Sequence, residues 1–146
     1  MTWYSEYVAL WDVLCNLVKD LVDADGNHIF ESKNVFYGEK YPPDEYPSCF
    51  VCPLPITITP LTFLQSTNSY YFEFGVVTTN SNTKQGYLTS FELIGKIYDA
   101  LVVDRSQGGK VCGTEPEQIL PNWRNLGSGV EGFWTGLRVK FTRIRA

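Results

Sequence analysis

The chain has 146 residues, 44% of them hydrophobic, and a formal net charge of −4 at pH 7. This length and composition predict a single folded domain with one core and exclude a largely disordered chain. The acidic balance argues against a protein that binds nucleic acid over a broad surface.

The first residues lack the basic start and the uninterrupted apolar run of a signal peptide, so secretion is not expected. No uncharged apolar run approaches the roughly 20 residues that a membrane-spanning helix needs, so no membrane partner is expected. Four cysteines without an export signal are most simply reduced thiols in a cytosol.

An amphipathic helix is predicted from about residue 3 to residue 22. Apolar side chains recur there at intervals of three and four residues, and polar side chains fill the other face. The apolar set is Trp3, Tyr7, Leu10, Trp11, Leu14, Leu17, Val18, Leu21 and Val22. Asp25-Gly26-Asn27 then supplies a left-handed stop, which is common after a helix.

Four stretches are predicted as strands before the second helix: residues 34–37, 48–54, 56–59 and 70–79. In the last of these, the aromatic residues Tyr70, Phe72 and Phe74 share one side because side chains alternate along a strand. The prolines between residues 42 and 47 exclude a helix between the first two strands.

The second helix is predicted from about residue 90 to residue 102, because Thr89-Ser90-Phe91-Glu92 matches a capping box. Residues 103–132 hold several glycines and prolines and no sustained period, so we expect a long irregular loop with a functional or mobile character. The final stretch, "GLRVKFTRIR", alternates apolar and basic residues and predicts a half-exposed strand.

The order of these elements predicts an α+β fold. Two helices are expected to pack on a mostly antiparallel sheet of four to five strands, in one domain that spans residues 1–146.

Cys49 and Cys52 form a Cys-x-x-Cys pair, which is the spacing of half a zinc site or of a redox dithiol. The two residues between them are strand-like, so the two sulfurs should point to opposite faces, which disfavours both kinds of site. Cys112 and His28 would complete a ligand set only by coincidence of folding. Packing as small buried side chains is preferred, and we expect no metal and no cofactor.

His28 is the sole histidine, and a general base held by Asp23 or Asp25 is one interpretation of "DADGNHIF". A solvated turn residue is preferred, because no serine or cysteine nucleophile stands in a recognisable elbow. The neighbouring acids Asp44 and Glu45 are also more typical of a solvated turn than of paired catalytic carboxylates. We therefore expect no catalytic residues.

Charge is divided unevenly along the chain. In the first 50 residues nine acids and three lysines give −6, whereas from residue 124 onward five bases and one acid give +4. Two faces of opposite sign either steer one copy onto the next or are neutralised within one fold. The basic cluster Arg138, Lys140, Arg143 and Arg145 fits three roles: protection of a sheet edge, a protein interface, or contact with nucleic-acid phosphates.

The chain resembles the tail-terminator proteins of long-tailed bacteriophages, also called tail-to-head joining or tail-completion proteins. The resemblance spans nearly the whole chain in the order of its elements. An N-terminal helix precedes "VFYGEKYPPDEYPSCFVCP", an aromatic strand, a second helix and a basic final strand. Specific echoes are Tyr37-Gly38-Glu39 followed by Glu45-Tyr46-Pro47, and Trp134-Thr135-Gly136 at the start of the last strand. The match is weakest over residues 103–132.

The resemblance implies a structural virion protein at the head–tail interface, assembled in the host cytoplasm. It implies a homo-oligomeric ring, typically of six subunits, that caps the tail tube. The implied partners are the tail tube protein and the head-completion or connector protein, with nucleic acid at most passing through the ring. The rival hypothesis is a small cytosolic hydrolase or thiol enzyme that uses His28, Asp25 or the two close cysteines.

A ring larger than a dimer requires two different, complementary patches on each subunit. The expected contact joins the proline-tyrosine turn of one subunit to the basic strand of the next. Its residues are Tyr41, Asp44, Glu45, Tyr46, Arg138, Lys140, Arg143 and Arg145.

Overall fold

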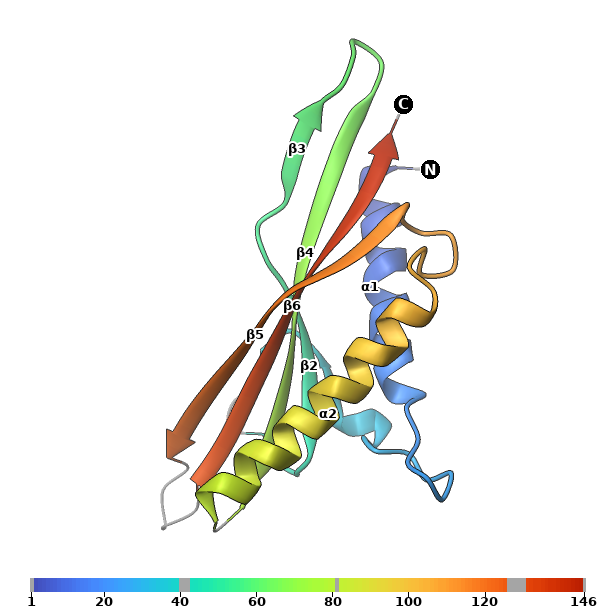
Figure 1. Cartoon of the computed structure of the whole chain (residues 1–146). Coiled ribbons are helices and arrows are strands. Elements are labelled where there is room, and N and C mark those ends of the chain that lie inside the picture. The colour runs from blue at the N-terminus through green and yellow to red at the C-terminus, as the bar shows by residue number, and fades with distance from the viewer. Residues whose placement is uncertain (1, 40–42, 81, 126–130, 146) are drawn as a thin grey trace.

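The computed structural model describes residues 2–39, 43–80, 82–125 and 131–145. Along this part of the chain (Figure 1) the elements are α1 (Trp3–Lys19), the 3-10 helix η1 (Ser32–Asn34), β1 (Val35–Tyr37), β2 (Ser48–Pro53), β3 (Thr57–Pro60), β4 (Ser66–Thr79), α2 (Thr83–Val103), β5 (Gly113–Asn125) and β6 (Glu131–Arg145). The predicted α+β class, with two α-helices in one domain, is confirmed.

The strands form one sheet in the order β1-β2-β4-β6-β5, and β3 pairs with the first residues of β4. β1 runs parallel to β2, and the other pairs are antiparallel. The sheet is therefore mostly antiparallel, as predicted. It has six strands in the described residues rather than four to five, and the additional strand is β5.

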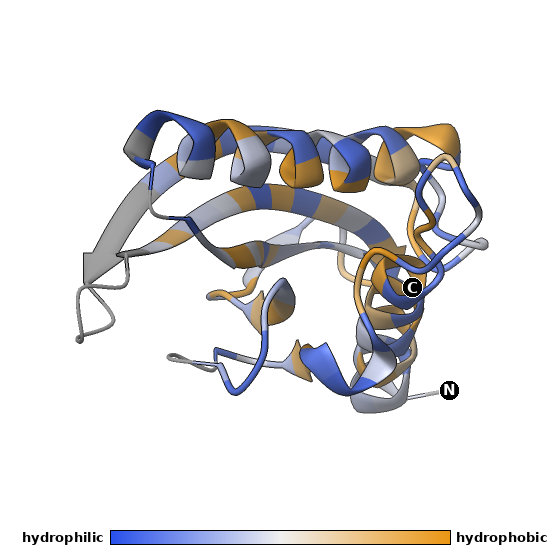
Figure 2. Cartoon of the chain, turned by 90° about the horizontal axis from the view of Figure 1, so that it is seen from below, coloured by the Kyte–Doolittle hydropathy of each residue, from blue (hydrophilic) through white to orange (hydrophobic). Residues whose placement is uncertain are grey.

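The two faces of the sheet have different surroundings, because side chains alternate along the long central strands β4 and β6. One face carries fully buried residues such as Phe72, Phe74, Val139 and Phe141, which belong to the same core as the apolar residues of α1 and α2. Figure 2 shows α2 running across this helix-covered face. The face without helices, called the open face below, carries the odd-numbered residues of β4 and the even-numbered residues of β6.

α1 begins where predicted and ends earlier than predicted. Thr2 is the N-cap, and its side chain and backbone form a capping box with Ser5. The helix ends at Lys19 rather than near residue 22, because the His28 ring binds the Lys19 carbonyl at 2.8 Å and Val22 forms a β-bridge with His28. The predicted stop Asp25-Gly26-Asn27 therefore forms the turn between Val22 and His28 and does not end the helix directly.

α2 begins at Thr83 rather than near residue 90. Asn82 is its N-cap, and the Asn82 side chain accepts a hydrogen bond of 2.9 Å from the Gln85 N–H. Gly86 lies in the early part of the helix, where a Cβ would stand 2.3 Å from the Phe133 ring. Glycine thus allows α2 to approach β6 closely, whereas in the sequence it looked like part of a loop.

Residues 113–125 form β5, so the predicted irregular loop over residues 103–132 is wrong across this stretch. Pro116 and Pro121 hide the strand in the sequence, and a bulge between Pro116 and Gln118 shifts its register against β6. β5 lies at the edge of the sheet, where proline is tolerated because one side of the backbone has no ladder partner. Residues 126–130 of the predicted loop lie outside the described residues.

The connection between α2 and β5 is a hydrogen-bonded turn. The Asp104 carboxylate accepts hydrogen bonds from the Ser106 N–H, the Ser106 hydroxyl and the Gly108 N–H. The bond from the Ser106 hydroxyl is the largest cause of the lowered pKa of Asp104. Gln107 is buried and donates to the Leu101 carbonyl and the Thr114 hydroxyl. Side chains therefore fix a segment that the sequence predicted to be irregular.

Candidate subunit interface

Arg138 and Lys140 lie on the open face, opposite the buried face of β6, as the alternation predicted. In the sheet register Arg138 stands between Glu73 on β4 and Gln118 on β5. Its Nε lies 3.3 Å from Oε1 of Glu73. Lys140 is flanked by Tyr71 and by Glu115 in the same way. The two bases are thus surrounded by acidic and polar groups of their own chain.

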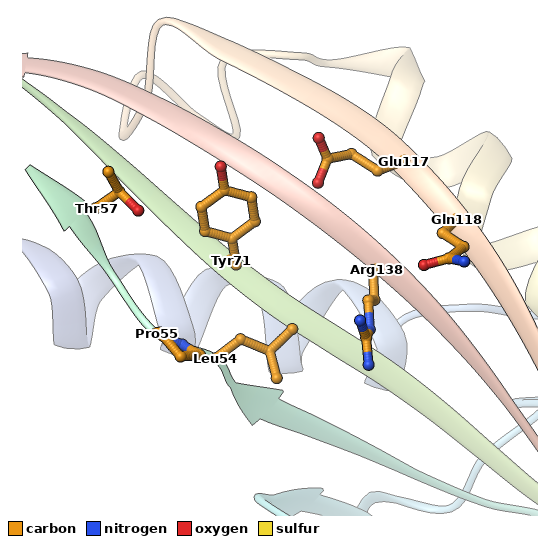
Figure 3. Close-up of a pocket in the computed structure, with 7 residues that line it drawn as sticks. All are labelled: Leu54, Pro55, Thr57, Tyr71, Glu117, Gln118 and Arg138. Atoms are coloured by element: carbon orange, nitrogen blue, oxygen red, sulfur yellow. The ribbon is translucent and has the colours of Figure 1, made fainter. Parts of the chain in front are cut away.

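A hollow of about 480 Å³ opens on this face around Arg138. Figure 3 shows its side chains, which come from the β2–β3 link and from β3, β4, β5 and β6. The lining residues are Leu54, Pro55, Thr57, Tyr71, Glu117, Gln118 and Arg138. Glu117 lies at the β-bulge of β5.

The lining of this hollow combines an apolar wall with charges of both signs. Leu54 and Pro55 supply the apolar part, and Arg138 and Glu117 supply opposite charges. A smaller hollow of about 200 Å³ continues from Arg138 toward Leu120 and Trp134. Mixed surfaces of this kind suit contact with another protein better than capture of a single small anion.

Arg143 and Arg145 lie on the helix-covered side and pair with α1. Arg143 Nη2 is 3.2 Å from Glu6 Oε1, and Arg145 Nε is 3.0 Å from Glu6 Oε2. Arg143 also donates to the Lys110 carbonyl. The Glu6 side chain is only 11% exposed, so these ion pairs fasten the end of β6 to the start of α1. Their predicted role at a subunit contact stays a prediction, and the pairs weigh against it.

The proline-tyrosine turn connects β1 and β2, at the edge of the sheet that β1 forms. β2 and β4 lie between β1 and β6 in the strand order, so the turn is well separated from the basic strand. Glu45 binds Lys33 at 2.8 Å and Asn34 at 3.2 Å, and the bond from Lys33 is the largest cause of its lowered pKa. Asp44 is exposed and Tyr46 is half-buried; burial raises the pKa of Tyr46. Tyr41 lies outside the described residues.

The turn and the basic strand are therefore not brought together within one chain. They are two separate patches, as a heterologous contact requires. Among the described ion pairs, those of Glu6 with Arg143 and Arg145 join the acidic N-terminal stretch to the basic C-terminal stretch, so the charge imbalance is answered inside the fold at Glu6.

Cys49 and Cys52 point to opposite faces of β2, as their spacing predicted. Cys49 is fully buried in the core, where burial raises the pKa of its thiol. Burial also raises the pKa of Cys52, and it raises that of the buried Cys15 to about 11. These three thiols stay protonated at neutral pH and are poor nucleophiles and metal ligands.

His28 is tied to the end of α1. One ring nitrogen, Nδ1, lies 2.8 Å from the Lys19 carbonyl and donates to it in the tautomer that this contact requires. Asp23 Oδ1 accepts the backbone N–H groups of Asp25 and Asn27. Asp23 thus organises the turn, and the contacts of His28 are those of a helix end.

Within the part of the chain that the structure describes, no three His, Cys, Asp or Glu side chains gather closely enough to hold a metal ion. Neither described helix is long and apolar enough to cross a membrane.

No protein-family model and no curated protein sequence matches the chain. Among solved structures, the chain is similar to a chain from the virion of a native gene transfer agent (GTA) particle. The TM-score is 0.52 at 16% sequence identity, and the match covers 95% of this chain and 98% of the other. The two chains therefore share their fold over almost their whole lengths.

Several residues of the open face were missed by sequence reasoning. Tyr71, Glu73, Glu117 and Gln118 surround Arg138, yet they belong to β4 and to the unrecognised β5. The alternation of residues 70–79 could have placed Tyr71 and Glu73 on the face of the bases once β4 and β6 were paired. Glu117 had no such signal, because the bulge at Pro116 shifts the register.

Proposed function

We propose that this protein is a structural subunit of a virion, the tail terminator of a long-tailed bacteriophage type of particle. Copies form a ring, typically of six, that caps the tail tube. One face of the ring docks on the head-completion or connector protein, and nucleic acid at most passes through the opening.

The observation that carries this proposal is the similarity of fold, over almost the whole of both chains, to a chain of a GTA virion. It agrees with the resemblance in element order to tail-terminator proteins.

The chemistry of the described residues favours assembly over catalysis. The buried thiols are held protonated, and His28 binds a helix end instead of a carboxylate. No observation within this part of the chain favours the rival hydrolase or thiol enzyme.

The contact between subunits is proposed to use the open face and the proline-tyrosine turn. Arg138 lines the hollow, Lys140 lies beside it on the same face, and Asp44 is exposed on the turn. Tyr46 on the same turn supplies aromatic contact area, and Tyr41, which lies outside the described residues, keeps the interface role proposed from the sequence. Arg138, Arg143, Arg145 and Glu45 all have ion pairs within the chain, and these pairs would have to open or be shared on assembly.

The test is the molar mass of the untagged protein by light scattering over a wide concentration range, together with negative-stain images. A closed ring that binds the ends of purified tail tubes, and not their sides, is the expected result. A protein that stays monomeric and leaves tube ends free would contradict the proposal. Turnover lost on His28→Ala would transfer support to the enzyme hypothesis.

A further inference from the structure

The β3–β4 hairpin ends in a projecting apolar tip. Figure 1 shows it reaching beyond the ends of α1 and β6. Phe63 is 106% exposed and Leu64 is 81% exposed, and Leu61 beside them is half exposed. We call Leu61, Phe63 and Leu64 the hairpin tip.

Backbone hydrogen bonds hold the hairpin tip in a defined shape. The Gln65 carbonyl accepts the N–H of Leu61 at 3.0 Å and that of Thr62 at 3.2 Å. The Leu64 N–H donates to the Thr62 hydroxyl at 3.2 Å. The apolar side chains are therefore displayed on a built turn, which lowers the entropy that a partner must remove on binding.

The tip stands in an uncharged part of the sequence. From Tyr46 to Phe72 the chain contains no Asp, Glu, Lys, Arg or His. Exposed sheet edges and hairpins of soluble proteins usually carry charges that prevent association. A projecting hairpin without them, ending in large apolar side chains, has the composition of an interface.

An apolar groove of about 420 Å³ lies at the other end of the molecule, between α2 and β5. Its described lining is Lys84, Tyr87, Leu88, Phe91 and Pro121, and Lys84 is the one charged residue among these five. Leu88 is 48% exposed and Phe91 is 40% exposed.

The floor of this groove is fixed by ring packing. The Tyr87 ring lies 5.0 Å from that of Phe133 and 6.1 Å from that of Phe91. In Figure 1 the start of α2 is at the opposite end of the molecule from the hairpin, so the hairpin tip cannot reach the groove of its own chain.

We propose that the hairpin tip of one copy inserts into the α2–β5 groove of a second copy. Within the described residues, the chain presents a projecting apolar tip at one end and an open apolar groove at the other, so a second copy can supply the occupant of the groove. Each copy carries a net charge of −4, and these two surfaces are places where copies approach without bringing acids together. The prolines of β5 disfavour pairing of strands at this edge, which leaves side-chain docking as the mode of contact.

The contact is heterologous, so it repeats from copy to copy and closes into a ring where the rotation permits. It rests on the proposed self-assembly, and it adds a second pair of surfaces to the open face and the proline-tyrosine turn. Aromatic rings on both sides, Phe63 on the tip and Tyr87 and Phe91 in the groove, are typical of residues that dominate interface affinity.

The test uses two double variants of exposed residues. The tip variant is Phe63→Ser with Leu64→Ser, and the groove variant is Leu88→Gln with Phe91→Gln. Val103→Gln, at an apolar residue that is 85% exposed elsewhere on α2, is the matched control. Sedimentation velocity is measured on each protein alone and on an equimolar mixture of the tip and groove variants.

Each double variant is expected to need a roughly tenfold higher concentration for assembly, whereas the control assembles like the parent. The mixture is expected to form a dimer of one copy of each, because only one intact tip and one intact groove remain. A photoreactive benzophenone amino acid in place of Phe63 should cross-link to residues 84–91 or 119–121 of another copy, a result that does not depend on the variants.

Rings formed equally well by the tip variant, or cross-links elsewhere on the copy, would overturn this contact and leave the proposed ring intact. A parent protein that stays monomeric at every concentration would overturn both. Binding of the parent, but not of the tip variant, to phosphatidylcholine–phosphatidylglycerol vesicles without any change in assembly would reassign the tip to a membrane surface.

Discussion

The helix-covered face of the sheet and the hairpin tip are built from the same kinds of residue with opposite outcomes. Phe72 is fully buried against Tyr7 of α1 and Phe141 of β6, whereas Phe63 is fully exposed. In the first region the apolar side chains find their partners within the chain, so they determine whether it folds. In the second they find none among the described residues, and the proposed contact between copies would use them. On that proposal, folding and assembly depend on separate regions of one small domain.

The sharpest test of this separation replaces one phenylalanine in each region by alanine. Phe72→Ala should lower the free energy of unfolding by about 3–5 kcal/mol, because it leaves a cavity in a close-packed core. Phe63→Ala should change it by less than about 0.5 kcal/mol, because the side chain is already in solvent. Urea denaturation of the two variants at a concentration below that of assembly measures both. Equal losses would show that the tip is part of the folding unit.

A second test concerns the ion pairs that join the two ends of the chain. Glu6→Gln removes the charge that both Arg143 and Arg145 contact, and it should cost about 1–3 kcal/mol of unfolding free energy. Glu45→Gln is the control, because its pair with Lys33 is well exposed and solvent screens it, so its loss should change the free energy of unfolding far less.

Salt separates the two cases further. The effect of Glu6→Gln should persist in concentrated salt, since partly buried pairs are poorly screened, while that of Glu45→Gln should vanish. A loss for Glu6→Gln that salt abolishes would return Arg143 and Arg145 to the set of residues free for a neighbour.

The sequence was most informative where a strong period coincides with burial. The three- and four-residue spacing of α1 and the alternation of β4 and β6 survive in the structure because those residues pack on one continuous core. α2 was predicted only in part, because Gly86 serves a close contact with Phe133 that depends on the position of β6. β5 was missed because two prolines and a bulge are tolerated at a sheet edge.

For the candidate interface, the sequence predicted which face of the strand the basic side chains occupy, but not which side chains they pair with. Alternation placed Arg138 and Lys140 on the open face correctly. It could not show that Arg143 bonds Glu6, a residue separated from it by almost the whole chain. Nor did it mark the hairpin tip, because a short apolar run in a sequence has the same pattern whether it is buried or exposed.

The smallest expected effect on stability and assembly comes from a third region, the open face of the sheet, which carries charges of both signs. Lys140→Glu is preferred to a change at Arg138, because Arg138 pairs with Glu73 within the chain. The new carboxylate would stand opposite Glu115 across the strands, and like charges there cost roughly 0.2–1 kcal/mol. The fold should remain, as judged by circular dichroism.

If the open face meets an acidic patch of the next copy, assembly should weaken by a similar small amount at every contact, and more at low salt. Lys96→Glu on α2 is the control, because it changes the net charge equally while lying on a helix away from the open face. Weakening by Lys140→Glu alone would place the open face in the contact between copies, whereas equal weakening by both would reduce the effect to net charge. No weakening by either would exclude the open face from the contact. The predicted role in protecting a sheet edge is wrong for Arg138 and Lys140, because β6 lies between β4 and β5.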